Sequence, residues 1–208
     1  MSATQKHKVQ AFKEGFFSCQ TKIKKNMIFG DKLDFAIESI VEKDLKRPSH
    51  PWGRMCIWVE GYSIGDFEEP HCGLYPAYNG FIESCKDLNT LWCDEFEGLS
   101  RREIWNILDG RLYGYHGNEE IDYDLLYEDS PNSETYWKYN FLTNWGEMFD
   151  CGGKAFLLNP SKNNLEILYF LSETNEIKSL FCSEAGFRKA SKDFSIWYDE
   201  QIDFFEID

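Results

Sequence analysis

The sequence has few of the residues on which enzyme active sites are usually built. It contains four histidines, at positions 7, 50, 71 and 116. None of them lies in a G-x-S-x-G turn, an H-E-x-x-H helix or a cysteine-protease context, and no glycine-rich turn suggests a nucleotide. Carboxylate pairs such as Asp122 and Asp124 arise by composition in a chain with 36 acidic residues. We therefore expect no catalytic residues, and a small cytosolic enzyme stays open only as an alternative.

The cysteines also lack the spacing of a disulfide framework or a metal site. There are seven of them, an odd number, and no two form a C-x-x-C pair. His71, Cys72, Cys85 and Cys93 offer soft ligands for zinc, but their spacing matches no established finger or ribbon. Several cysteines fall on apolar faces, where a free thiol behaves as a small hydrophobic side chain. The sequence predicts no disulfide, no metal and no cofactor.

Long apolar runs are absent, and basic residues are scarce over most of the chain. No segment could span a bilayer, and no apolar stretch follows the N-terminal lysines as it would in a secretion signal. Residues 1–26 hold six lysines and one acid, whereas residues 27–208 carry a net charge of −19. This charge disfavours nucleic acid and anionic lipid and favours a basic partner, although it also serves ordinary solubility. We expect a cytoplasmic protein that binds no nucleic acid and no membrane.

The chain contains enough apolar and aromatic residues to form one hydrophobic core. Aromatic residues make up 17% of a chain of 208 residues, which can bury a core without disulfides or metals. No internal repeat or linker interrupts it. We therefore predict a single domain over residues 27–208, preceded by a basic extension, residues 1–26, outside the fold. An amphipathic helix in that extension, attached to a membrane surface, is the alternative.

The clearest local pattern is a hairpin early in the acidic part of the chain. Residues 35–41 have the composition of a strand, and residues 54–60 alternate between apolar and polar side chains. Gly61-Tyr62 fits a type II′ turn, because glycine adopts a positive φ without a steric cost. This turn predicts that Val59 lies opposite Ile64.

Three short motifs in this region resemble those of a known family. They are MIFGD at residues 27–31, FAIE at residues 35–38 and WVEGYSIGD at residues 58–66. Their order and form resemble the start of the immunity protein 42 family, bacterial proteins that protect a cell against the toxin domain that it or its kin deliver. A weaker similarity extends over roughly residues 27–200 and includes Leu112-Tyr113-Gly114. The resemblance implies a toxin-binding protein and supplies no catalytic residue.

The rest of the chain predicts helices followed by a meander. Helices are expected near residues 79–92 and over residues 100–110, where Ser100 and Glu103 form a capping box. Residues 135–142 have the composition of a strand.

Three more strands are expected at residues 154–158, 165–171 and 176–182, because turn-rich residues separate the first two. A last amphipathic helix begins at Ser183. The sequence thus predicts an α+β fold: a mainly antiparallel sheet with a C-terminal three-strand meander and helices packed on it.

Acidic segments are the candidate sites for a basic partner. The longest, residues 115–129, contains interleaved tyrosines and no lysine or arginine, and the others are the loops at residues 66–69 and 94–97. Complementary charge speeds encounter and aromatic anchors hold a complex, although a solvated acidic loop is the simpler interpretation. The candidate toxin-binding residues are Tyr115, Glu119, Glu120, Asp122, Tyr123, Asp124, Tyr127, Glu128, Asp129, Asp66, Glu68, Glu69, Asp94, Glu95 and Glu97.

Together these observations favour a protein that binds a basic cognate toxin C-terminal domain stoichiometrically and blocks it by occlusion, a nuclease being one candidate for the toxin. A general intracellular adaptor stays open as an alternative. A toxin gene immediately upstream would favour immunity, whereas a metabolic operon would favour an enzyme.

A chain that begins at Met27 is expected to keep its thermal midpoint and its protective activity, because the charge and the family-like sequence both change at that residue. Thermal unfolding followed by circular dichroism measures the midpoint. A loss of several degrees at this chain size would show instead that residues 1–26 pack on the body.

Overall fold

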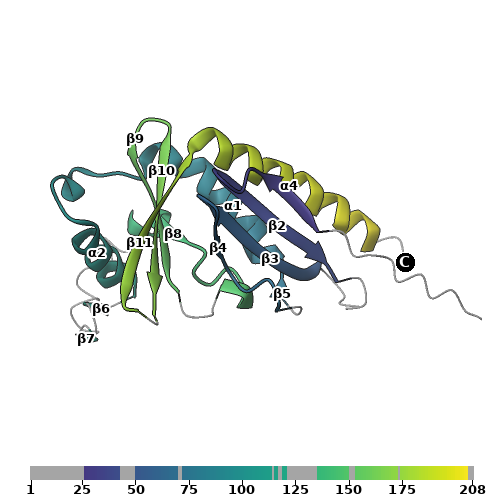
Figure 1. Ribbon diagram of the computed structural model, residues 1–208, viewed down its shortest axis with the longest axis horizontal. Coiled ribbons are helices and arrows are strands. Elements are labelled where there is room, and N and C mark those ends of the chain that lie inside the picture. Colours follow the sequence, from purple (N-terminus) through teal and green to yellow (C-terminus); the bar gives the residue numbers. More distant parts are fainter. Residues whose placement is uncertain are drawn as a thin grey trace, which may run out of the picture.

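The computed structural model describes most of the chain from Asn26 onward. The described residues are 26–42, 50–69, 72–113, 115–116, 119–120, 135–149, 153–172 and 174–205. Within them, two larger antiparallel sheets lie side by side, with helices packed on them (Figure 1). This arrangement confirms the predicted α+β fold. Of the expected extension, only Asn26 falls within the described residues.

The first sheet is built from the N-terminal part of the chain. Its strands pair in the order β1-β2-β3-β4, and β5 also pairs with β3. The strands are β1 (Met27–Gly30), β2 (Phe35–Val41), β3 (Trp52–Val59), β4 (Tyr62–Ile64) and β5 (Cys72–Gly73). The strand expected at residues 35–41 therefore coincides with β2.

The hairpin between β3 and β4 forms, but its turn differs from the expected one. Glu60 and Gly61 are the central residues, and both have a positive φ, 52° and 78°. Val59 therefore pairs with Tyr62, and Ile64 pairs with Ile57. The predicted type II′ turn was wrong because it reserved positive φ for glycine. Two positive φ angles in succession are typical of a type I′ turn, whose twist matches that of the flanking strands.

The second sheet contains the expected meander. Its strands pair in the order β11-β10-β9-β8. They are β8 (Asn140–Phe141), β9 (Ala155–Ser161), β10 (Asn164–Leu171) and β11 (Glu176–Ser183). Most residues of β9 and the first half of β10 are buried, as their unbroken apolar runs indicate.

The strand expected at residues 135–142 was largely wrong. A short 3₁₀ helix, η3 (Trp137–Tyr139), precedes the two residues of β8. In a strand, Trp137 and Tyr139 would point to the same face. The helical turn separates them instead, because Tyr139 is 1% exposed and Trp137 is 48% exposed.

The three longer helices begin where the sequence offers a start signal. They are α1 (Tyr75–Asp87), α2 (Arg101–Tyr113) and α4 (Glu184–Phe205). Pro76 stands in the first turn of α1, where its missing N–H costs nothing, so α1 begins earlier than expected. It also ends earlier, since residues 88–90 form the 3₁₀ helix η1 (Leu88–Thr90).

The ends of α2 give one confirmation and one correction. The Ser100 N–H donates to Glu103 Oε2 at 2.7 Å, and the Glu103 N–H donates to Ser100 Oγ at 3.3 Å. This is the predicted capping box. Gly110 does not end the helix, which continues to Tyr113. Asp109, buried together with Gly110, forms an ion pair with Lys154 at 2.5 Å.

Helices α1 and α4 cover one face of the first sheet (Figure 1). Phe81 of α1 lies at the centre of this layer, and its ring centroid is 6.3 Å from that of Phe35 in β2. The same ring is 5.8 Å from Phe194 of α4 and 6.2 Å from Phe141 of the second sheet. The two sheets therefore share one aromatic core.

A polar junction joins the β1–β2 turn to the place where β11 becomes α4. The Ser183 N–H donates to Asp34 Oδ1 at 2.6 Å, and the Ser183 hydroxyl donates to Asp34 Oδ2 at 2.5 Å. Ser183 Oγ also accepts from the Gly186 N–H, as a helix N-cap does. A Cβ at Gly186 would lie only 2.1 Å from Asp34 Oδ2, so this approach requires glycine. Next along β11, the Phe181 N–H donates to Glu60 Oε2.

A buried carboxylate fixes α2 on the second sheet. Glu166 of β10 is fully buried, and its Oε1 lies 2.6 Å from Nε of Arg101 in the first turn of α2. Removing the cation from such a pair leaves an uncompensated buried charge.

Arg101→Ala is therefore expected to lower the free energy of unfolding by about 3 kcal/mol. Arg102→Ala is the matched control, because Arg102 is exposed and its guanidinium donates to the Asn175 carbonyl at the surface. The control is expected to cost less than about 1 kcal/mol. Urea denaturation measures both, and equal losses in the two variants would show that the Arg101–Glu166 pair does not stabilise the fold.

Candidate functional site

The acidic loop at residues 94–97 is anchored on the body by an aromatic side chain. It contains the 3₁₀ helix η2 (Asp94–Phe96). Phe96 is 1% exposed, and its ring packs against Trp92 and Tyr139 at centroid distances of 5.6 and 5.4 Å. Asp94 and the glutamates on either side of Phe96 are exposed. The loop thus presents its acids to solvent from a fixed position.

Two aromatic donors hold the glutamates of this loop. The Trp92 indole N–H donates to Glu97 Oε1 at 2.9 Å, and the Tyr136 hydroxyl donates to Glu95 Oε2. Burial, followed by the bond to Glu95, raises the pKa of Tyr136 to about 12. The phenol therefore keeps its proton at neutral pH and remains a donor. Across the tyrosine ring lies the guanidinium of Arg111, 5.7 Å from the centroid.

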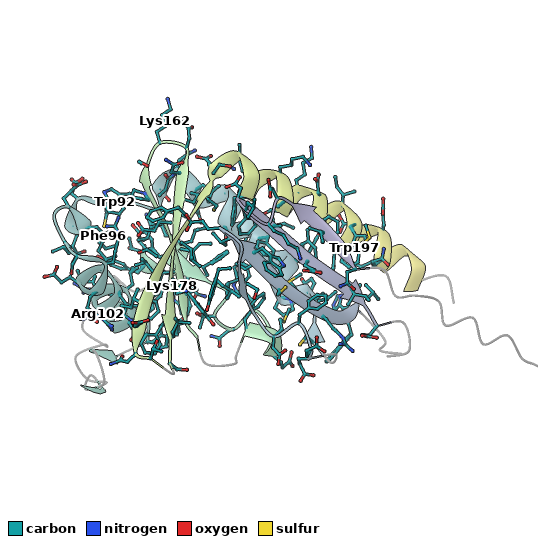
Figure 2. The ribbon with its side chains drawn as sticks, in the orientation of Figure 1. Trp92, Phe96, Arg102, Lys162, Lys178 and Trp197 are labelled. Atoms are coloured by element: carbon teal, nitrogen blue, oxygen red, sulfur yellow. The ribbon has the colours of Figure 1, made fainter. Side chains whose placement is uncertain are left out.

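An exposed tryptophan stands next to this pair. Trp137 is 48% exposed, and its ring meets the edge of Tyr113 at a centroid distance of 6.2 Å. Tyr113 is held in turn by Asn140, whose Oδ1 accepts from the phenol at 2.6 Å. We refer to Trp92, Glu95, Glu97, Tyr136 and Trp137 together as the α2–η3 surface. Figure 2 shows Trp92 and Phe96 at the same end of the molecule as Arg102 of α2, far from Trp197 of α4.

The described residues that flank the longest acidic segment meet at this surface, where Tyr113 contacts Trp137. The segment follows α2 directly, and β6 (Tyr115–His116) pairs with β7 (Glu119–Glu120). The described chain resumes at Thr135, next to Tyr136 and Trp137. Of the other candidates in this segment, Asp122, Tyr123, Asp124, Tyr127, Glu128 and Asp129 lie outside the described residues. The structure therefore brings the flanks of residues 115–129 close to the loop at residues 94–97.

The third acidic loop lies elsewhere, beside the first sheet. The Asp66 N–H donates to the Met148 carbonyl in η4 (Glu147–Phe149) at 2.7 Å. Glu68 Oε2 is 3.6 Å from Nη1 of Arg54 in β3. Figure 1 shows β5, which follows this loop, at a distance from β6 and β7. Among the described residues, the loop at residues 66–69 therefore lies apart from β6 and β7.

The carboxylates near this third loop affect the pKa of the buried Cys72 thiol. Burial, followed by the negative charges of Glu147 and Glu69, raises the pKa of Cys72 to about 12. Burial likewise raises the pKa of Cys56 to about 12. Thiols of this kind are inert, which agrees with their role as small hydrophobic side chains.

Neither a metal centre nor a membrane span emerges from the described residues. In the part of the chain that the structure describes, no three His, Cys, Asp or Glu side chains converge as metal ligands. His71, one of the ligands considered from the sequence, lies outside this part. No helix among the described residues is long and apolar enough to cross a bilayer.

Sequence reasoning missed the aromatic half of the α2–η3 surface and also Glu147 of η4, which lies near the third loop. Trp92 falls at the end of the helix predicted near residues 79–92, and Trp137 falls in the strand predicted at residues 135–142. The useful signal was the Tyr136-Trp137 pair directly after the acidic segment, since paired aromatic residues beside acids are typical of binding surfaces. Glu147 gave no such signal, because 78 residues separate it from Glu69 along the chain.

The sequence matches the family model of immunity protein 42 over residues 27–197. The chain belongs to the immunity protein 42 family. The match confirms the resemblance carried by the three motifs in residues 27–66. As a member of this family, the protein is a toxin-neutralising immunity protein.

The fold has a counterpart among solved structures. The crystal structure of CdiI from Burkholderia dolosa AUO158 is similar to this chain, with a TM-score of 0.58 and 15% sequence identity. The similarity covers 82% of this chain and 99% of that protein. At this identity, the comparison establishes a shared fold. A comparison with curated proteins gave no match.

Proposed function

We propose that this immunity protein acts in the cytoplasm by binding one cognate toxin domain stoichiometrically and covering a basic surface of it, without catalysis. The α2–η3 surface and the acidic segment at residues 115–129 form the main contact. The observation that carries the proposal is the exposed Trp137, which directly follows Tyr136, the residue whose hydroxyl already holds Glu95 in position.

Charge supports a basic partner. Residues 27–208 carry a net charge of −19, and a basic partner would be drawn towards this body over several ångströms. Such attraction raises the rate of association more than the final affinity. A toxin that acts on nucleic acid would present a basic cleft of the matching sign, so a nuclease is a candidate for the toxin.

Preorganisation supports tight binding at the α2–η3 surface. Binding usually costs conformational entropy when long acidic side chains become ordered. Here the Trp92 indole and the Tyr136 hydroxyl already order Glu97 and Glu95. Each carboxylate has a second oxygen that can accept from an arginine or lysine of the toxin. Trp137 adds a large apolar surface of the kind that forms hot spots.

Co-expression tests the proposed function. The toxin domain encoded next to this chain is expressed in cells with and without the immunity protein, and survival is measured. Full protection is expected at equal amounts of the two proteins, together with a one-to-one complex in size-exclusion chromatography. If the toxin kills equally well in both cases, the proposal fails. Protection at far less than equal amounts would point to an enzyme instead.

Charge reversal at Glu119, Glu120, Asp122 and Asp124 is expected to slow association with the toxin and to weaken protection, because it removes the long-range attraction. The fold should stay intact, since connecting segments of this polarity lie at the surface. Surface plasmon resonance gives the association rate, and circular dichroism checks the fold. An unchanged rate in the folded variant would remove this segment from the interface.

Two further variants complete that comparison. Charge reversal at Glu83 of α1 and Glu200 of α4, both exposed, is the control and should change the association rate much less. Trp137→Ala should act mainly on the dissociation rate, at a cost of about 2 kcal/mol. If Trp137→Ala changes neither rate, the α2–η3 surface is not the main contact.

A further inference from the structure

An open pocket of about 510 Å³ lies away from the α2–η3 surface. Its walls come from β3, β5, the start of α1 and the segment between β8 and η4. The side chains that define it are His50, Trp52, Tyr75, Asn144 and Glu147. Its volume is within the range of small-ligand sites, so it has room for a long side chain.

Aromatic rings form the fixed side of the pocket. The His50 ring stacks on Tyr75 with centroids 4.4 Å apart and an angle of 12°. Tyr75 is 40% exposed, and behind it Tyr78 stacks on the fully buried Tyr198 at 4.3 Å. The rings thus continue from the pocket into the core, which fixes Tyr75. The face of an aromatic ring attracts a cation.

The opposite side carries negative charge. Glu147 is exposed, and among the described residues its carboxylate has no hydrogen bond or ion pair. Glu69 and Asp66 lie near enough that all three carboxylates act on the buried thiol of Cys72. No lysine or arginine of the described residues lines the pocket. A cation that entered would therefore meet a carboxylate without displacing another cation.

The backbone holds this acidic side rigidly. Asn144 has a φ of 64° and Gly146 a φ of 133°, both in the left-handed region. A Cβ at Gly146 would lie 2.7 Å from Sδ of Met148, so glycine is required there. Conformations of this kind are maintained where the surrounding structure fixes them, and they place Glu147 at the mouth of the pocket.

We propose that this pocket receives an arginine side chain of the bound toxin. Its guanidinium would stack on Tyr75 or Trp52 and pair with Glu147. Arginine fits better than lysine, because the planar guanidinium combines stacking on a ring with directed hydrogen bonds to a carboxylate. The proposal rests on the proposed function for the identity of the partner, whereas the affinity of the pocket for a guanidinium can be measured on the immunity protein alone.

The probe for the first experiment is arginine amide, with citrulline amide as a neutral analogue of the same shape. Both are titrated into the ¹⁵N-labelled protein, and the Trp52 indole signal is assigned by its loss in Trp52→Phe. Arginine amide is expected to shift this signal saturably, and citrulline amide is not. Equal effects of the two amides, or no saturable shift with either, would overturn the proposal.

Single-residue variants then test whether Glu147 and Tyr75 contact the guanidinium of arginine amide. Glu147→Gln is expected to weaken arginine amide about threefold, and Tyr75→Leu about as much, since both contacts are solvent-exposed. Glu95→Gln, on the α2–η3 surface, is the matched control and should leave the affinity unchanged. The same affinity in Glu147→Gln and in the unaltered protein would contradict the assignment of Glu147.

The last experiment links the pocket to the toxin. Bound toxin is expected to abolish the shifts that arginine amide causes. If the complex still binds arginine amide with unchanged affinity, the toxin does not use the pocket, although protection in co-expression would stand. Conversely, a failure of protection in cells would leave the arginine-amide titration of the free protein unaffected.

Discussion

The aromatic ring of Phe81 sets the relation between the two halves of the molecule. It stands on α1 and contacts rings from β2, α4 and β8, and also Trp145, which follows β8, at a centroid distance of 5.1 Å. A Cβ at Gly80 would lie 2.2 Å from that tryptophan, so Trp145 can reach Phe81 only across a glycine. Because each sheet buries one face against the same cluster, neither half has a complete core of its own. The shared core therefore holds the two sheets, and the acidic surfaces on them, in one relative position.

Hydrogen bonds between turns of the first sheet and β11 join the two sheets in addition to the aromatic core. The outer edge of β11 would otherwise offer unpaired N–H groups, which invite association with other strands. Asp34 and Glu60 accept from two of them, at Ser183 and Phe181, and both acids come from turns of the first sheet. The turn at Glu60 differs from the predicted one, and its role becomes clear only in the folded structure. It directs a carboxylate onto a strand that follows 121 residues later.

Local patterns in the sequence predicted the parts of the fold that depend on neighbouring residues. The capping box at Ser100 needs only Glu103, and the meander needs only apolar runs separated by turn residues. The sequence was misleading at Gly110, which stays helical where its neighbour Asp109 pairs with the distant Lys154. For the candidate site, too, the sequence predicted local features and missed contacts between distant residues. Its acids were visible in the sequence, but the pairing of Glu95 with Tyr136 joins residues 41 positions apart.

The position of α4 in the chain links protection to protein synthesis. The apolar face of β1 and β2 is covered by α4, whose last residue is 205, and Asp34 finds its partner only at Ser183. Domains begin to fold while the ribosome is still adding residues. In this protein β1 and β2 are synthesised first, but α4, which covers their apolar face, is synthesised last. A chain that lacks α4 therefore exposes that face. A chain that stops before α4 is therefore expected to lack the packed frame that carries the acidic surfaces, and with it the capacity to neutralise the toxin.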